Sequence, residues 1–195
     1  MTIKKGEAWG EPGLLPSDGV VARSDRAISR ALEEARARNA PFPTFGIVGG
    51  DLRRTLGGTG ALTTTYPIDV GEALIDGRHH YFVAHLVARD RGWRHVAVAM
   101  NAQWLGEWNL GPRAHPNDGV LDTYKANLGL ADRLKVRKRL PTGSHLPHPG
   151  IAAERGNAVT IELSRPLPVY VDGERVGVGR TLALRVLPDA LRTVA

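Results

Sequence analysis

The 195-residue sequence contains no cysteine. Disulfides, thiolate catalysis and cysteine-ligated zinc are therefore excluded. Also missing is a run of about 18 consecutive apolar residues, the length that a transmembrane helix needs. The N-terminal segment, MTIKKGEAWGEPG, has Gly, Glu and Pro where a secretory signal carries an apolar stretch. From these absences we expect a cytoplasmic protein.

What the sequence does contain is typical of a globular protein. Hydrophobic residues make up 42% and charged residues 24% of the chain, and its length favours one domain with a short appendage. A formal net charge of +6 favours acidic partners such as nucleic acid, anionic lipid or nucleotide phosphate. Many soluble proteins rich in Arg and Ala are basic without such a partner, so charge alone leaves both interpretations open.

The first part of the chain predicts one β-α-β unit. Residues 1–18 show no periodicity and predict an irregular lead-in. A strand is predicted at 19–23, and Ser24-Asp25 supplies a helix N-cap ahead of a helix at 26–38. A buried strand at 44–48 follows. The two strands should lie parallel with a right-handed crossover between them.

Beyond residue 60, apolar runs alternate with Gly, Pro, Asn and Asp, a pattern typical of an antiparallel sandwich or barrel. Asp76-Gly77 and Asp172-Gly173 are predicted as hairpin turns, because such turns require the positive φ that Gly adopts. We therefore predict an α+β fold, an antiparallel β-sandwich with a small N-terminal β-α-β unit, divided into residues 1–60 and 61–195. The predicted strands are 63–70, 81–88, 96–101, 120–124, 134–140, 158–163, 169–171 and 181–186.

A glycine-rich segment follows the second predicted strand. It begins with Gly49, Gly50 and Asp51 and includes Arg53 and Arg54. Its exposed amides and arginines could hold an anion such as a phosphate head group. Alternatively, the glycines only close a turn between a strand and a helix. The sequence does not decide between these interpretations.

The most basic stretch is residues 134–140, LKVRKRL. As a strand it would place Lys135, Arg137 and Arg139 on one face. Such a face suits peripheral contact with an anionic membrane. A solvated edge strand protected by charges explains the same pattern.

Histidine and tryptophan give weaker indications. His145 and His148 have a spacing that suggests metal ligands, but the prolines beside them exclude the helical face on which such ligands usually converge. Trp93, Trp104 and Trp108 cluster in the sequence and are either core residues or the lining of an apolar pocket's mouth.

Three stretches, in this order, resemble the bacterial diacylglycerol kinases and their sphingosine kinase relatives. Residues 101–122, NAQWLGEWNLGPRAHPNDGVLD, resemble a family segment with a Pro-x-Ala followed by an Asp-Gly-x-Leu-Asp turn. Residues 143–149 resemble a His-containing run before a strand. Residues 168–174, together with 184–191, resemble the family's Asp-Gly-Glu hairpin and its closing strand. The resemblance covers roughly residues 65–195.

This resemblance implies an ATP-binding α/β domain and a β-sandwich that face each other across a cleft. Asp172 would then be the general base that takes a proton from a lipid hydroxyl. Glu174 would help to hold a catalytic magnesium through water. Asp118, with the carbonyls of its turn, would match a structural magnesium site. The structural alternative is that both aspartates only bond the backbone of their own tight turns.

The nucleotide half departs from the family pattern. The family has a Gly-Gly-Asp-Gly-Thr phosphate loop and, further on, a second glycine-rich motif. The segment with Gly49, Gly50, Asp51 and Arg54 fits the second motif better, because Leu52 stands where the phosphate loop needs glycine. The resemblance implies magnesium and ATP as cofactors, but without this loop we do not expect independent ATP binding.

The expected function is therefore recognition of a lipid or other apolar hydroxyl compound without independent kinase activity. The alternative is a minimal ATP-dependent lipid kinase whose cleft is completed by a homodimer or by a partner that supplies the nucleotide domain. A nucleic-acid-binding module is the weakest hypothesis, because only the net charge of +6 favours it.

Overall fold

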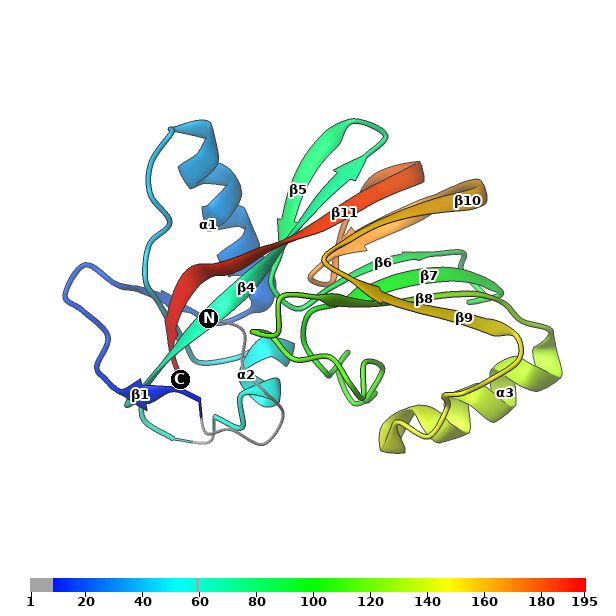
Figure 1. Cartoon of the computed structure of the whole chain (residues 1–195), viewed down its shortest axis with the longest axis horizontal. Helices are drawn as coiled ribbons and strands as arrows, with labels where there is room; N and C mark the ends of the chain where they lie inside the picture. The colour runs from blue at the N-terminus through cyan, green and yellow to red at the C-terminus, as the bar shows by residue number, and fades with distance from the viewer. Residues whose placement is uncertain (1–8, 59) are drawn as a thin grey trace.

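The computed structural model describes residues 9–58 and 60–195, and its eleven strands form one sheet that curls into two facing layers (Figure 1). The main path of the sheet runs β1-β4-β11-β10-β6-β7-β8-β9. The strands are β1 (Glu11–Pro12), β2 (Val20–Ala22), β3 (Phe45–Ile47), β4 (Thr64–Ile75), β5 (Arg78–Phe82), β6 (His85–Arg89), β7 (His95–Met100), β8 (Leu121–Asn127), β9 (Ile151–Gly156), β10 (Ala158–Val171) and β11 (Glu174–Val194). The helices are α1 (Asp25–Ala37), α2 (Asp51–Thr55), α3 (Leu130–Arg139) and the 3-10 turn η1 (Leu140–Thr142).

The sandwich core lies between the layer of β4, β11 and β10 and the layer of β6 to β8. Alternate residues of each strand point inward, as the two-residue period of a strand requires. Leu182 and Val159 from one layer share a buried cluster with Leu86, Ala97 and Leu121 from the other. The antiparallel sandwich and the α+β class are thus confirmed.

The N-terminal β-α-β unit is also confirmed, and it is joined to the sandwich through the sheet. Strands β2 and β3 pair in parallel, and β3 pairs in parallel with β11 as well. The Ser24 Oγ accepts a hydrogen bond from the Ala27 N–H (3.2 Å), which caps α1. Ile28 and Leu32 of α1 are fully buried against the sheet. The predicted domain boundary at residue 60 stays a prediction. Strand β3, before this boundary, and strand β11, after it, belong to the same sheet.

Both predicted hairpin turns are present. The φ angles are 46° at Asp76 and 83° at Gly77, and 46° at Asp172 and 84° at Gly173. Two successive positive φ angles define the turn that matches the twist of a two-residue hairpin. The first turn joins β4 to β5, and the second joins β10 to β11.

The prediction of one strand at 81–88 is wrong. The ladder stops after Phe82 and resumes at His85, because the backbone N–H groups of Val83 and Ala84 turn toward the Asp172 carboxylate (3.0 Å each). The predicted strands 158–163 and 169–171 are, in contrast, one strand, β10, whose register shifts between Glu162 and Leu167. Such a shift lets a long strand bend from one layer to the other.

The prediction of a strand at 134–140 is also wrong, since these residues belong to α3 and η1. Lys135, Arg137 and Arg139 therefore do not form one face of a strand. The helix α2 follows Gly50, as the interpretation of the glycines as a turn between a strand and a helix implies, whereas the strand β9, which pairs with β8, was not predicted. In the described part of the chain, no helix combines the length and apolar character needed to cross a membrane.

Candidate functional site

The β10–β11 hairpin carries the Asp172 carboxylate to the break between β5 and β6. Asp172 Oδ2 accepts a hydrogen bond from the Val83 N–H, and Oδ1 accepts from the Ala84 and His85 N–H groups, each at 3.0 Å. The Asp172 N–H donates in turn to the His85 carbonyl (2.9 Å). Only 8% of Asp172 is exposed. A buried carboxylate thus lies where the interruption between β5 and β6 leaves three backbone amides in need of acceptors.

A second buried carboxylate, Asp25, comes from the start of α1 and contacts the start of α2. Asp25 Oδ2 accepts from the Asp51 N–H (2.6 Å), and Oδ1 accepts from the Leu52 N–H (3.2 Å). Gly50 adopts a φ of 101°, and a Cβ at this position would collide with the Asp25 carboxylate. The amides that the sequence suggested for an external phosphate are thus bonded to a carboxylate of the chain itself.

His85 links these residues. Its Nε2 lies 3.0 Å from Asp51 Oδ2, and Asp51 Oδ1 accepts from the Gly106 N–H (2.9 Å). We refer to Asp25, Asp51, His85 and Asp172 as the buried cluster. It unites side chains from α1, α2, β6 and the β10–β11 turn.

Burial and charge shift the pKa values within the buried cluster. Burial, followed by the charge of Asp172, raises the pKa of Asp25 to about 7. Burial acts to lower the pKa of His85, but the hydrogen bond to Asp51 and the charge of Asp172 outweigh it and raise that pKa. Burial raises the pKa of Asp172 itself. Groups with shifted pKa values that gather in one place are typical of a functional site, although structural ion-pair networks shift pKa values as well.

Glu174 points away from the buried cluster and is held by two arginines of α1. Its Oε2 lies 3.1 Å from Arg26 Nε and also pairs with Arg30. These hydrogen bonds, that of Arg30 first, lower the pKa of Glu174. An open depression of about 530 Å³ lies here, lined by Ser24, Arg26, Ala27, Arg30, Asp172, Gly173 and Glu174. Two guanidinium groups thus pair with Glu174, and its expected role in holding a magnesium through water stays a prediction.

The arginines of the glycine-rich segment are also engaged. Arg54 stacks on the Trp104 ring (3.8 Å to the centroid) and donates to the Gly106 carbonyl. Arg53 donates to the carbonyls of Ile47 and Gly60. This geometry favours the interpretation in which the glycines close a turn. Binding of a cofactor by Gly49, Gly50, Asp51 and Arg54 stays a prediction.

Asp118 lies in the turn before β8, and its carboxylate is satisfied by the protein. Its Oδ1 accepts from the Val120 N–H (3.2 Å), and its Oδ2 pairs with Arg155. Burial raises the pKa of Asp118 to about 6, and Asp122 adds to this effect. Over residues 9–58 and 60–195, no three acidic, His or Cys side chains gather as they would around a metal ion. Binding of magnesium by Asp118 and the carbonyls of its turn stays a prediction, and we derive no chemical step through it.

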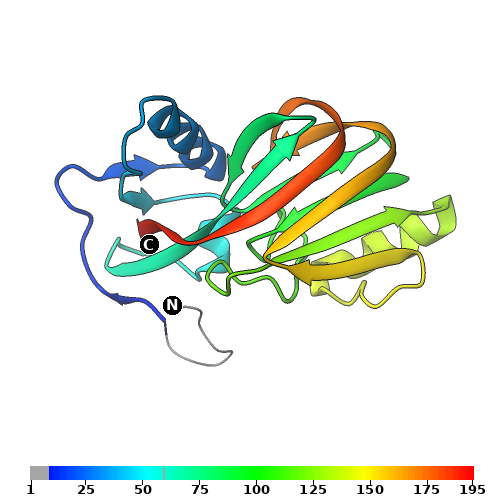
Figure 2. The same ribbon diagram turned by 45° about the horizontal axis from the view of Figure 1, so that its top comes forward.

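A separate apolar cavity lies beneath α3, on the outer face of β7 and β8. Its volume is about 250 Å³. Figure 2 shows α3 beside the β8–β9 end of the molecule, opposite the end that carries α1. The lining consists of Gly92, Trp93, Val96, Val98, Trp108, Leu110, Tyr124, Ala126, Leu128, Leu130, Arg133, Leu134, Val136, Arg137, Leu140, His145 and Ile151. Two of the three clustered tryptophans thus line a cavity, whereas Trp104 stacks on Arg54.

Sequence reasoning did not single out Asp25 or His85 as site residues. Asp25 stands between β2 and α1 in the segment Arg23-Ser24-Asp25-Arg26-Ala27. The available signal was an aspartate between a predicted strand and a predicted helix. A single histidine in the apolar run that becomes β6 offered none.

The chain was compared with known proteins. Residues 45–195 match the family described as YegS C-terminal NAD kinase beta sandwich-like domain. Three solved structures of proteins described as diacylglycerol kinases from Bacillus anthracis str. Sterne, two of them only provisionally, have a similar fold, with TM-scores of 0.65, 0.62 and 0.61. Their identities to this chain are 14%, 14% and 15%, over 91% of this chain and 78%, 78% and 76% of theirs. The comparison with curated proteins gave no match.

Proposed function

We infer a ligand-binding role from the premise that this chain belongs to the family of the YegS C-terminal NAD kinase beta sandwich-like domain. The proposed function is binding of a lipid or other apolar hydroxyl compound, without phosphate transfer by this chain alone. The observation that carries the proposal is the apolar cavity of about 250 Å³ beneath α3.

The cavity has the character of a ligand site. Pockets for small molecules are lined mainly by apolar and aromatic side chains, with a few polar groups at defined positions. Here Trp93 and Trp108 contact each other edge to face (5.4 Å between centroids, 77°), and valines and leucines form most of the remaining lining. None of the α3 side chains is fully buried. The helix therefore covers the cavity without closing it, and we propose that ligands enter beside it.

Tryptophan emission provides the test, because Trp93 and Trp108 line the cavity. Purified protein is titrated with 1,2-dioctanoylglycerol, and saturable quenching or a shift of the emission is expected. The variant Ala126→Phe adds a phenyl ring to the lining and should abolish this signal. Ala152→Phe, at an exposed position on the neighbouring strand β9, is the matched control and should bind normally. Equal responses in wild type and Ala126→Phe would contradict the proposal.

The proposed absence of independent phosphate transfer is supported by the groups around Asp172. Three amides bond its carboxylate, and Arg26 and Arg30 neutralise Glu174. A general base needs a free lone pair within reach of the hydroxyl proton. Of the roughly four lone-pair positions of a carboxylate, three are already used.

An ATP-dependent lipid kinase completed by a second copy or by a partner domain is the alternative function. The shifted pKa values of the buried cluster, in particular the value of about 7 for Asp25, favour it. Transfer of labelled γ-phosphate from magnesium-ATP to dioctanoylglycerol is the assay. If a homodimer completes the site, the activity per protomer must rise with protein concentration. Activity of dilute protein that does not depend on concentration would contradict the proposal that this chain does not act alone.

We also propose that α3 contacts an anionic bilayer. The helix carries Arg133, Lys135, Arg137, Lys138 and Arg139 against the single acid Asp132. Leu130 and Leu134 are 65% and 55% exposed beside the cavity. Basic residues near an anionic surface each contribute about 1 kcal/mol, and exposed leucines add apolar contact.

This contact is tested by co-sedimentation with phosphatidylcholine vesicles that contain about 30% of the anionic lipid phosphatidylglycerol. Binding should weaken with added salt and in the double variant Lys135→Gln/Lys138→Gln. A matched pair elsewhere, Arg78→Gln/Arg180→Gln near the β4–β5 turn, should change it little. Equal binding to vesicles without phosphatidylglycerol would exclude the charge-based contact.

A further inference from the structure

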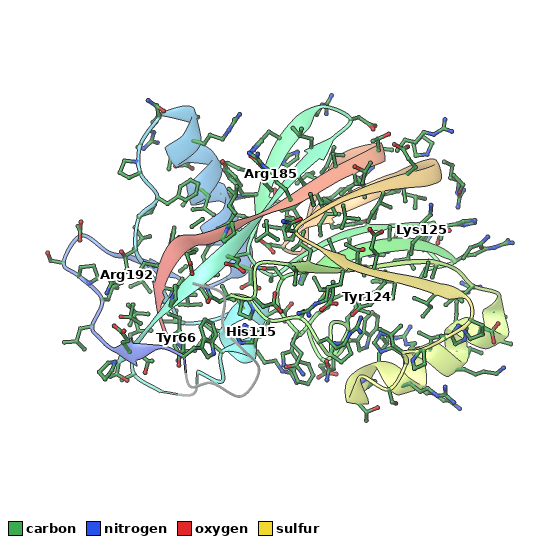
Figure 3. All side chains as sticks on the ribbon, viewed as in Figure 1. Tyr66, His115, Tyr124, Lys125, Arg185 and Arg192 are labelled. Carbon is green, nitrogen blue, oxygen red and sulfur yellow. The ribbon has the colours of Figure 1, made fainter. Side chains whose placement is uncertain are left out.

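Two polar side chains in the lining of the cavity are buried without a hydrogen-bond partner. His145 is 2% exposed and Tyr124 is 5% exposed. In the described part of the chain, neither nitrogen of the His145 ring nor the Tyr124 hydroxyl forms a hydrogen bond of normal geometry. Their rings lie 6.3 Å apart in an edge-to-face arrangement. Figure 3 shows Tyr124 on the part of the sheet that lies toward α3.

Such an arrangement is uncommon and costly. Most buried polar side chains in native proteins have at least one hydrogen-bond partner, and leaving one unpaired costs the desolvation of that group. The Leu110 backbone forms a weak hydrogen-bond contact with the His145 ring, and the Arg113 guanidinium forms one with the Tyr124 hydroxyl, and both contacts shift the pKa values of these groups. Neither contact has the distance and angles of a normal hydrogen bond, so the capacity of both side chains is left largely unused. The other polar side chains of the lining are the Trp93 and Trp108 indoles and the Arg133 and Arg137 guanidinium groups, and Arg133 Nε is likewise buried without a hydrogen-bond partner among the described residues.

Both side chains are uncharged near neutral pH. Burial lowers the pKa of His145, so its ring offers one N–H donor and one nitrogen acceptor. Burial raises the pKa of Tyr124, so its hydroxyl keeps its proton and both donates and accepts. Two neutral groups with donors and acceptors suit an uncharged oxygen function. An ammonium group would lose its hydration there without gaining an opposite charge, whereas the cationic Arg133 and Arg137 in the lining would attract a carboxylate.

We propose that Tyr124 and His145 bind the hydroxyl or ester carbonyl oxygen of an apolar ligand at the inner end of the cavity beneath α3. This inference rests on the proposed function and deepens it, because it assigns the ligand class and two specificity-determining residues. The apolar lining holds the hydrocarbon part, and the two side chains select an uncharged oxygen over an ammonium group.

The test uses ligands of equal chain length. Binding of 1-octanol, octanoate and octylammonium is measured by tryptophan emission at pH 7.5. We expect 1-octanol to bind roughly tenfold more tightly than octylammonium, and the positive charge of Arg133 and Arg137 to make this difference smaller for octanoate. Equal affinities for all three would overturn the inference but leave the binding function standing. If none of them binds and dioctanoylglycerol does not bind either, the proposed function itself fails.

Two variants separate recognition from a structural role. Tyr124→Phe and His145→Leu remove the polar atoms but keep most of the side-chain volume. Each should weaken 1-octanol binding by about five- to tenfold, the effect of one lost hydrogen bond. Their melting temperatures should stay the same or rise, because an apolar group replaces an unpaired buried polar one. Tyr66→Phe, on β4 and outside the cavity (Figure 3), is the control and should change neither property.

A clear fall in melting temperature for both variants, with unchanged 1-octanol affinity, would show that the two side chains serve the fold, for example by binding an internal water. That result would overturn the inference.

Discussion

The substitution Asp172→Asn should destabilise the protein, whether or not Asp172 has a catalytic role. The carboxylate accepts three backbone N–H bonds, with Oδ1 bonded to Ala84 and His85 and Oδ2 bonded to Val83. An asparagine has only one acceptor oxygen. If that oxygen takes the place of Oδ1, the bond from the Val83 N–H is lost, because this N–H then faces the new NH₂ group. If it takes the place of Oδ2, the bonds from Ala84 and His85 are lost.

The magnitude follows from this count. A hydrogen bond to a charged group contributes about 1.5–3 kcal/mol, and a buried donor left unpaired costs about 1–3 kcal/mol. The loss of charge offsets part of this, because burial raises the pKa of Asp172 and so opposes its ionised form. We expect a net loss of about 2–4 kcal/mol, which for a chain of this size lowers the melting temperature by roughly 5–15 °C.

Differential scanning calorimetry checks this expectation. The control is Glu174→Gln two residues away, which removes only half-exposed ion pairs with Arg26 and Arg30 and should shift the melting temperature by no more than about 2 °C. An unchanged melting temperature for Asp172→Asn would refute the view that this carboxylate fastens the break between β5 and β6. If the expected fall is observed, loss of any activity in this variant cannot by itself identify a general base.

Three further predictions concern stability. Gly50→Ala should lower the melting temperature by roughly 5 °C or more, because a Cβ there collides with the Asp25 carboxylate at a φ of 101°. The pKa of Asp118 is raised to about 6, so its contribution to stability is complete below its unfolded pKa and is lost as the pH rises through 6. The free energies of unfolding of Asp118→Asn and wild type are measured in urea at pH 4 and pH 8. The variant's value should rise relative to that of wild type as the pH rises, by at most about 3 kcal/mol. A difference that does not change with pH would contradict the raised pKa. Leu182→Ala, at a fully buried position, should cost about 2–5 kcal/mol in the same assay, whereas Leu134→Ala at 55% exposure should cost little.

The elements that the sequence predicts correctly depend on local interactions. The cap of α1 is a bond from Ser24 to a residue three positions away, and the two hairpin turns depend on adjacent Asp-Gly pairs. The prediction of a strand in place of α3 was wrong because it also depended on a local pattern. Within 134–140 the apolar residues alternate as in a strand, but Leu130 and Leu134, like Val136 and Leu140, are spaced four apart, which is the helical period. A window that began at Leu130 would have favoured the helix.

The candidate sites were harder to predict because they assemble residues that are far apart in the chain. Asp172 bonds amides 87–89 positions before it, and Asp25 bonds amides 26 and 27 positions after it. No spacing rule in a single sequence reports such contacts. The cavity beneath α3 combines side chains of β7, β8, α3 and the loops before and after them. Its existence depends on how far the helix stands from the sheet, which the sequence does not encode in any local pattern.

The central claim, that the cavity beneath α3 holds an apolar hydroxyl compound, is tested most directly by photolabelling. An alkyl alcohol with a diazirine in its chain is irradiated with the protein, and the labelled peptides are mapped by mass spectrometry with and without excess 1-octanol. The account predicts labels on α3 and on the segment of β8 around Tyr124 and Ala126, which 1-octanol displaces. Labels that gather instead around Asp172 and Glu174, or that 1-octanol does not displace, would contradict it.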